Sequence, residues 1–252
     1  MVDNKRIVEN MVLPSKGMIY EEEINPEIEL GSMKTKHEML RLSATEESQK
    51  IMAEIIDDCL GTDLGISSYD LCLGDFQFLL YRLRTVTFGP EYEMSCRCPY
   101  CGYENIITLN LDELPVHEYT DELGDLLEFT LPISEQRIKL TMQTPRMLDR
   151  INARVREHNK RRPNSNENTT VLYTIMACIE EIDGEAVDLT MMENWVRELP
   201  MADTNAILHR IDQVNNSIGI ELDSMASCRV CGSTFVAPFR VNETFFRPNP
   251  TF

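Results

Sequence analysis

The chain contains 252 residues, of which 42% are hydrophobic, and its formal net charge at pH 7 is −18. This length is sufficient for one large domain or two small ones. No apolar run is long enough to predict a membrane span, and residues 1–12 are too charged for a signal peptide. Because a strongly negative protein repels phosphate backbones, the composition disfavours nucleic-acid binding and favours protein partners.

The first 89 residues are expected to form an extended segment followed by two helices. Short strands are predicted at 18–22 and 28–30, between turn-forming residues. Thr45 is a suitable N-cap for a helix that ends near residue 60, and a second helix is predicted over 75–88. Both helices carry apolar residues at the spacing of a buried face: Ile51, Met52, Ile55, Ile56 and Cys59, then Phe76, Leu79, Leu80, Leu83 and Val86.

A Cys-x-x-Cys-Gly motif occupies residues 98–102, between segments 91–97 and 105–111, which alternate as β-strands do. Two residues between the cysteines allow a tight turn to direct both sulfurs to one point. The glycine after them permits the positive φ that closes such a knuckle. The pattern predicts a β-hairpin with a cysteine pair at its tip.

Residues 113–219 are expected to be mainly helical. Two strands are predicted near the start, at 126–132 and 137–142. The first helix after them is basic, since residues 146–162 contain seven Arg or Lys against two acidic residues. Four helices are predicted in all. The first begins at Thr144-Pro145, and the second begins at Asn168 and continues through Ile182. The third surrounds Trp195, and the fourth runs from Pro200 to Ile218.

A second Cys-x-x-Cys-Gly motif follows at 228–232, between strand-like segments 220–226 and 234–241. One knuckle supplies two thiolates, and a structural zinc ion takes four ligands in a tetrahedral site. The sequence therefore predicts one structural zinc. Cys101 and Cys228 lie 127 positions apart, whereas the knuckles of a zinc ribbon are roughly 15–20 residues apart. The ion would join the two ends of a long insertion, and its predicted ligands are Cys98, Cys101, Cys228 and Cys231.

Disulfides or free thiols are the alternatives to a metal site. A redox Cys-x-x-Cys would be expected to open a helix after a buried strand, which neither motif does. Cys96 is a substitute ligand, although it lies too close to Cys98 to form a knuckle with it. Cys59, Cys72 and Cys178 fall on or beside apolar helix faces and are expected to be small buried hydrophobes. Free cysteines and a thiolate site fit a reducing compartment.

The sequence contains no recognisable catalytic constellation. It has no glycine-rich phosphate loop, no His-Glu-x-x-His motif and no nucleophile in a known context. Four thiolates would fill the zinc shell and leave no open position for catalysis. We assign no catalytic and no cofactor-binding residue and expect the protein not to be an enzyme. Its scattered histidines are expected at solvated positions: His37, His117, His158 and His209.

Two segments are predicted to contact partner proteins. The tail at 242–252 contains three phenylalanines among prolines that prevent regular structure, so its rings would suit pockets on a partner. Three arginines recur every four residues on the basic helix and form one stripe that can orient an acidic partner. The alternative is that the rings pack on their own domain and the arginines are solvated. The residues concerned are Phe245, Phe246 and Phe252, with Arg146, Arg150 and Arg154.

Together these patterns predict an α+β fold with a zinc-ribbon-like β subdomain of two cysteine-knuckle hairpins. A mainly helical insertion splits this subdomain, and an N-terminal strand-plus-helix segment precedes it. The expected divisions are 1–89, then 90–112 together with 220–241, then 113–219 as a β-hairpin plus the helical insertion, and 242–252 as the docking tail.

Several stretches carry a family resemblance along most of the chain. They are LPSKG at 13–17 followed by Tyr20, LCLGDFQFLLYRLRTVTFGPEYE at 71–93, LPISEQRIKL at 131–140, ELPMADTNAILHRID at 198–212, IGIEL at 218–222 and FFRP at 245–248. With the two Cys-x-x-Cys-Gly motifs, they resemble the baseplate hub subunit or hub-assembly family of contractile-tailed, T-even-type bacteriophages. The resemblance is densest at 71–114 and 195–248 and weakest at 146–167.

This resemblance implies a non-enzymatic structural or assembly protein of the tail baseplate, in its hub region. Its partners would be other phage baseplate and tail proteins, and no nucleic acid is expected among them. It would be located in the virion tail baseplate, and in the host cytoplasm during assembly. Not all relatives keep both cysteine pairs, so the zinc is argued from this sequence alone. A zinc-ribbon regulatory or nucleic-acid-binding protein is the alternative function, which the net charge of −18 disfavours.

Overall fold

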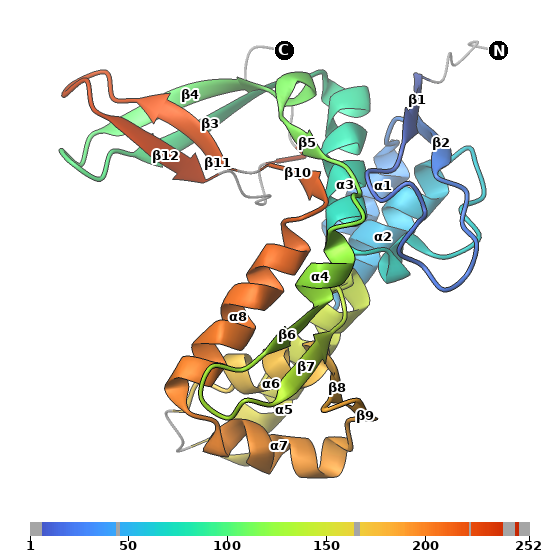
Figure 1. Ribbon diagram of the computed structural model, residues 1–252. Coiled ribbons are helices and arrows are strands. Elements are labelled where there is room, and N and C mark those ends of the chain that lie inside the picture. The colour runs from blue at the N-terminus through green and yellow to red at the C-terminus, as the bar shows by residue number, and fades with distance from the viewer. Residues whose placement is uncertain (1–6, 44–45, 164–166, 222, 239–244, 247–252) are drawn as a thin grey trace.

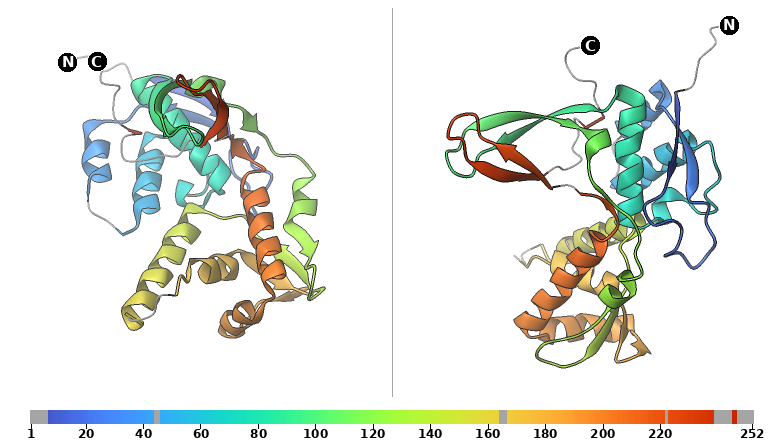
Figure 2. Two further views of the ribbon diagram at one scale, coloured as in Figure 1. Left: turned by 90° about the vertical axis from the view of Figure 1, so that its left-hand side faces the viewer. Right: turned by 45° about the horizontal axis from the view of Figure 1, so that its top comes forward.

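The computed structural model describes residues 7–43, 46–163, 167–221, 223–238 and 245–246. It is an α+β protein with small antiparallel sheets, as expected (Figure 1). An N-terminal body surrounds a central helix, and an arm of two β-hairpins projects from one side of that helix. A lower body lies beyond the end of the helix that is opposite the root of the arm (Figures 1 and 2).

The N-terminal body is built around helix α3, and its apolar core contains the two helix faces that the sequence predicts. Ile55 and Ile56 from one helix and Leu79 and Leu83 from α3 are fully buried. The elements are strands β1 (Val8–Val12) and β2 (Glu27–Gly31), helices α1 (Thr35–Arg41) and α2 (Ser48–Cys59), the 3-10 helix η1 (Ser68–Asp70), and α3 (Leu73–Phe88).

Asp75 attaches the N-terminal loop to the first turn of α3. Its side chain is fully buried, and its carboxylate accepts hydrogen bonds from the N–H of Ser15 (2.9 Å) and the hydroxyl of Tyr20 (2.7 Å). Burial raises the pKa of Asp75, and these two donors offset part of that effect. A buried carboxylate without hydrogen-bond donors would destabilise the fold. The N-terminal loop is therefore held where Ser15 and Tyr20 can donate to Asp75.

Arg84 fixes the root of the arm to the last turns of α3. The fully buried guanidinium donates to the carbonyl oxygens of Gly89 (2.8 Å) and Glu91 (3.2 Å) and lies over the rings of Phe88 and Tyr92. A buried guanidinium held by two carbonyls cannot shift without leaving donors unpaired. The direction of the first strand of the arm is therefore set by α3.

The arm consists of two antiparallel hairpins, one from each side of the long insertion. They project together away from α3 (Figures 1 and 2). Its strands are β3 (Glu91–Arg97) and β4 (Glu104–Asn110), and then β11 (Asp223–Ser227) and β12 (Thr234–Pro238). The 3-10 helix η2 (Leu111–Glu113) follows β4.

A two-stranded neck connects the arm to the lower body. Strand β5 (Val116–His117) pairs with β10 (Gly219–Ile220), so the chain leaves and re-enters at one place. Here Gly74 of α3 lies against the returning chain: a Cβ at Gly74 would be 2.2 Å from the carbonyl oxygen of Ile218. Only a glycine fits so close to another backbone.

The described part of the lower body contains five helices and a small sheet of order β6-β7-β8-β9. Its core is separate from that of the N-terminal body and includes Ile138, Ile175 and Ile207, all fully buried. Its elements are α4 (Leu123–Leu127), β6 (Glu128–Thr130), β7 (Arg137–Leu140), α5 (Pro145–Arg161), α6 (Thr170–Cys178), β8 (Ile179–Ile182), β9 (Glu185–Ala186), α7 (Leu189–Glu198) and α8 (Met201–Asn215).

Helix α5 joins the lower body to the N-terminal body through buried and partly buried polar contacts. Asp149 accepts hydrogen bonds from the N–H of Lys50, at the start of α2, and from the hydroxyl of Tyr69, both at 3.0 Å. Arg146 makes a two-pronged ion pair with Asp70 (2.5 and 2.7 Å) and lies over the Tyr69 ring. The first arginine of the predicted stripe is therefore used within the chain, which corrects its expected role as a partner contact.

Two predicted elements differ from the structure. Residues 18–22 form turns and bends instead of a strand. The helix expected to continue through Ile182 ends at Cys178, because the segment after it pairs with β7 as strand β8. Ile179 and Ile182 are β-branched, and their register partners in β7 are Leu140 and Ile138. Thr45, the expected N-cap of α2, lies outside the described residues.

The expected docking role of the tail is wrong for Phe245 and Phe246. Both rings are buried in the N-terminal core, with 0% and 3% of their surface exposed. The Phe245 ring lies 5.1 Å from the ring of Tyr81 and 5.4 Å from that of Tyr92, measured between centroids. These rings pack against aromatic side chains of the chain's own core, so they are not available to a partner. Phe252 and most of 239–252 lie outside the described residues.

Replacing Phe245 with Ala is expected to lower the free energy of unfolding by about 3–5 kcal/mol, because it removes a buried ring and leaves a cavity. Chemical denaturation of the purified protein measures this change. The matched control is Met39→Ala, since Met39 is 71% exposed, and its effect should stay within about 0.5 kcal/mol. An unchanged midpoint for Phe245→Ala would contradict the buried position of the ring.

Candidate metal centre

The arm brings the four predicted metal ligands together. Their sulfur atoms all lie within 4.8 Å of one another, in the cluster Cys98, Cys101, Cys228 and Cys231. The sulfur of Cys98 is 3.7 Å from that of Cys231, and the sulfur of Cys101 is 3.6 Å from that of Cys228. In a tetrahedral site with metal–sulfur bonds of about 2.3 Å, neighbouring sulfurs are about 3.8 Å apart. A disulfide would require about 2.05 Å. The cluster could therefore hold a metal ion.

The two knuckles have the same backbone geometry. The N–H of Gly102 donates to the carbonyl oxygen of Cys98, and the N–H of Gly232 to that of Cys228, both at 2.9 Å. The φ angles of these glycines are +74° and +72°, in the region that the sequence motif predicts for them. Exchange of the two knuckles maps one close sulfur pair onto the other, so the cluster has an approximate two-fold symmetry.

Each knuckle contributes one buried and one exposed cysteine. Cys98 and Cys228 are 1% and 3% exposed, and they face a small core between the hairpins, whereas Cys101 and Cys231 face solvent. This core also contains Ala226, Phe235 and Ala237. Because this core is small, a metal ion bound by the four sulfurs would add to the contacts that hold the tip of the arm together.

Asn105 is a functional residue that sequence reasoning missed. Its side chain is 2% exposed, and its carbonyl oxygen accepts the N–H of Arg229 (3.0 Å). Its amide donates toward the sulfur of Cys228 (3.7 Å). Asn105 thus links the first hairpin to the second knuckle. Its position as the one buried polar residue in the alternating β4 pattern was the available signal, but the partner lies more than 120 residues away.

Nearby donors favour the thiolate forms of the second knuckle. The backbone N–H groups of Cys231 and Val230 lower the pKa of the Cys228 thiol to about 6. The hydroxyl and N–H of Ser233 lower the pKa of Cys231. Since metals bind the thiolate, these groups present the second knuckle in the form that a metal ion requires.

The other cysteines lie elsewhere. Cys96 packs beside the small core of the arm but is not a member of the four-sulfur cluster. Cys59, Cys72 and Cys178 are buried, as expected, and burial raises the pKa of Cys72 and of Cys178 to about 12. They are buried thiols outside the four-sulfur cluster, each beside a polar group: Cys59 lies 3.4 Å from His37 Nδ1, Cys72 accepts the N–H of Asp75 (3.4 Å), and Cys178 accepts a side-chain N–H of Gln143 (3.3 Å).

The expectation of solvated histidines is correct for His117 and His209 and wrong for the other two. His37 is 3% exposed and its Nε2 atom lies 2.5 Å from the carboxylate of Asp58. His158 is buried with its Nδ1 atom 3.0 Å from the hydroxyl of Tyr173. Each therefore contacts a polar neighbour inside its own body of the protein, and the Nε2 atom of His158 lies 3.9 Å from the carboxylate of Glu167.

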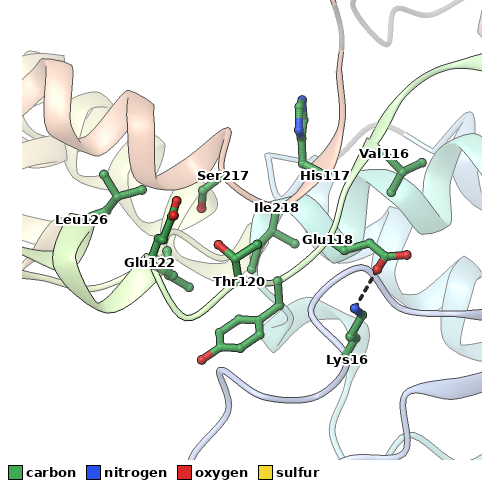
Figure 3. Close-up of a pocket in the computed structure, with 11 residues that line it drawn as sticks. Lys16, Val116, His117, Glu118, Thr120, Glu122, Leu126, Ser217 and Ile218 are labelled. Atoms are coloured by element: carbon green, nitrogen blue, oxygen red, sulfur yellow. Dashed lines mark ion pairs between the residues drawn. The ribbon is translucent and has the colours of Figure 1, made fainter.

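A surface hollow of about 630 Å³ lies beside the neck (Figure 3). An ion pair between Lys16 and Glu118 (2.6 Å) crosses its edge, and both side chains are about half exposed. Its two buried lining residues, Leu123 and Ile218, are apolar. The rest of its lining comes from the N-terminal loop, the neck and α4, so the hollow lies at the junction of two bodies.

Within the part of the chain that the structure describes, no helix combines the length and apolar character needed to cross a bilayer.

Comparison with protein families gives a match over nearly the whole chain. The model of the family described as T4 bacteriophage base plate protein matches residues 7–247, which is nearly the whole chain. The matched range includes both hairpins of the arm, the neck and the lower body. Comparison with curated proteins and with solved structures gave no match. The resemblance noted in the sequence is confirmed at the level of the baseplate family.

Replacing Asn105 with Ala should weaken metal binding about 10- to 100-fold, because a residue that supports a ligand sulfur and its knuckle is lost. Competition with a chromophoric chelator, using Co²⁺ and Zn²⁺ as probes, measures the affinity. Asn10→Ala on the exposed face of β1 is the matched control and should leave the affinity unchanged. Asn105→Asp keeps the acceptor for Arg229 but places a carboxylate near the sulfurs, so it should weaken binding at least as much. Wild-type affinity in both Asn105 variants would contradict this role.

Proposed function

Because this chain belongs to the T4 bacteriophage base plate protein family, we propose that it is a structural or assembly protein of the hub region of a contractile tail baseplate. The family match over residues 7–247 is the observation that carries this proposal. The net charge of −18 supports a protein that acts through contacts with other proteins. On this proposal the chain is not an enzyme, and it passes through the host cytoplasm during assembly.

The proposal includes one structural zinc ion held by the four-cysteine cluster. Its support is the donor set of four cysteines and sulfur separations of 3.6 and 3.7 Å, close to the edge of a zinc–thiolate tetrahedron. Four thiolates complete the shell, so the ion would stabilise the arm and have no free position for a substrate. Residues 90–112 and 220–241 would then act as one subdomain, entered and left by the insertion 113–219.

Part of the basic helix is proposed to face a neighbouring baseplate protein. Arg150 and Arg154 of α5 are exposed, one turn apart, and the described residues provide no ion pair for either. In a chain with 42 acidic and 24 basic residues, such a face can set the orientation of an acidic partner. Arg146 is excluded from this face because Asp70 holds it.

A zinc-ribbon regulator or nucleic-acid binder remains the second candidate, and the exposed arginines of α5 are the observation that favours it. Binding to nucleic acid depends on neutralising several phosphates. The two exposed arginines of this face, on a chain of charge −18, provide few such contacts. The baseplate role is therefore the better supported of the two.

Purified wild-type protein is expected to contain one zinc ion per chain, measured by elemental mass spectrometry. Cys228→Ser should lose most of the zinc and unfold at lower denaturant concentration, because the ion joins segments distant in sequence. Cys96→Ser is the matched control, since Cys96 lies in the same arm outside the cluster, and it should retain the ion. Equal zinc contents in the two variants would contradict the assigned ligands.

The chain is expected to be present in baseplate assemblies isolated from infected cells, detected and quantified by mass spectrometry. Arg150→Glu combined with Arg154→Glu should reduce its incorporation while leaving its stability unchanged. Arg146→Glu serves as a comparison, since it breaks a pair within the chain and should lower stability. Absence of the chain from both the assemblies and the virion, together with its recovery on DNA, would favour the nucleic-acid alternative.

A further inference from the structure

The arm ends in exposed apolar side chains next to the cysteine cluster. Tyr100 is the third residue of the first knuckle and Val230 holds the equivalent position in the second, and they are 69% and 64% exposed. Tyr103, just beyond the first knuckle, is 45% exposed. These side chains add little to the chain's own core, so the free energy of burying them is available to a partner.

Positive charge accompanies these apolar groups. Arg97 precedes the first cysteine of its knuckle, and Arg229 follows the first cysteine of the other. Both side chains are exposed, and neither forms an ion pair among the described residues. We call Arg97, Tyr100, Tyr103, Arg229 and Val230 the arm tip. The arm tip combines apolar side chains with two arginines on a protein of charge −18. Glu104, the register partner of Arg97, accepts a hydrogen bond from the hydroxyl of Ser95.

The arm tip is held in one conformation. Contacts of 3.6 and 3.7 Å between sulfurs place one knuckle against the other, and Asn105 holds the backbone of Arg229 from the facing hairpin. At the opposite end, Arg84 fixes the root of the arm to α3. A surface that is ordered before binding loses little conformational entropy when it binds.

We propose that the arm tip binds a second baseplate protein, at an apolar pocket on that protein bordered by carboxylates. Tyr100 and Val230 enter the pocket, where a few buried anchors supply most of the binding energy. Arg97 and Arg229 meet the carboxylates at its rim and fix the orientation. This inference rests on the proposed function, and it names the surface through which that function operates.

The chemistry of the tip favours a protein over a nucleic acid. Proteins that bind single-stranded nucleic acid combine several stacking rings with a long basic groove. Here Val230 has no ring, and the two arginines at the tip do not form a long basic groove. Two arginines are sufficient to pair with a few carboxylates at the rim of a pocket on a protein partner.

The test uses full-length protein and baseplate intermediates from infected cells that lack this chain. The fraction of chain that cosediments with the intermediates is measured over a range of chain concentrations. Tyr100→Ser combined with Val230→Ser should weaken binding at least about tenfold, with zinc content and unfolding unchanged because both residues are exposed. The matched control is Met39→Ser combined with Met201→Ser, at 71% and 70% exposure on α1 and α8, and it should bind as the wild type does. Arg97→Glu combined with Arg229→Glu should also weaken binding.

The outcomes separate the two levels of the proposal. If the wild type binds and the arm-tip variant binds equally well, the proposed surface is wrong and the baseplate function stands. If the wild type does not bind the intermediates, the baseplate function fails and the inference fails with it. Two further measurements assign the tip to another occupant and so overturn the proposal. These are binding of single-stranded DNA that requires Tyr100, and self-association in sedimentation velocity that the arm-tip variant abolishes.

Discussion

The return of the chain to the side of α3 is the constraint on which the other features depend. The neck pairs Gly219 with His117 and Ile220 with Val116, across about a hundred residues of intervening chain. Closing a loop of that length costs conformational entropy, which the contacts at its ends must offset. Gly74 and Gly219 allow the backbones to touch, and Ile220 reaches the core of the N-terminal body. Because the loop is closed at this place, the two hairpins extend from the side of α3 next to each other.

The local parts of this design could be predicted from the sequence. Each knuckle depends on five consecutive residues, so the positive φ of Gly102 and Gly232 and the hairpins around them follow from the motif itself. The faces of α2 and α3 follow from apolar spacing in the same way. A helix was expected to begin at Thr144-Pro145, and α5 does so, with the hydroxyl of Thr144 accepting the N–H of Met147 (3.2 Å) as an N-cap.

The parts that could not be predicted depend on contacts between distant segments. Nothing near Phe245 in the sequence indicates that Tyr81 and Tyr92 surround it, so a Pro-broken aromatic tail was interpreted as a docking segment. Arg146 has the same spacing in the sequence as the other arginines of its stripe, and only the fold brings Asp70 next to it. Asn105 lay in a strand with an ordinary alternating pattern, and its importance comes from the second knuckle.

The separation of the two knuckles also has a consequence in time. Ribosomes add roughly 5–20 residues per second, so the 127 positions between Cys101 and Cys228 take about 6–25 s to synthesise. During that interval the first knuckle has two sulfurs and no counterpart, and the complete cluster can exist only after residue 231 has been made. A chain that stops between the two knuckles contains α3 and the first hairpin but lacks two of the four sulfurs. The four-sulfur cluster thus distinguishes chains that extend past residue 231 from shorter ones.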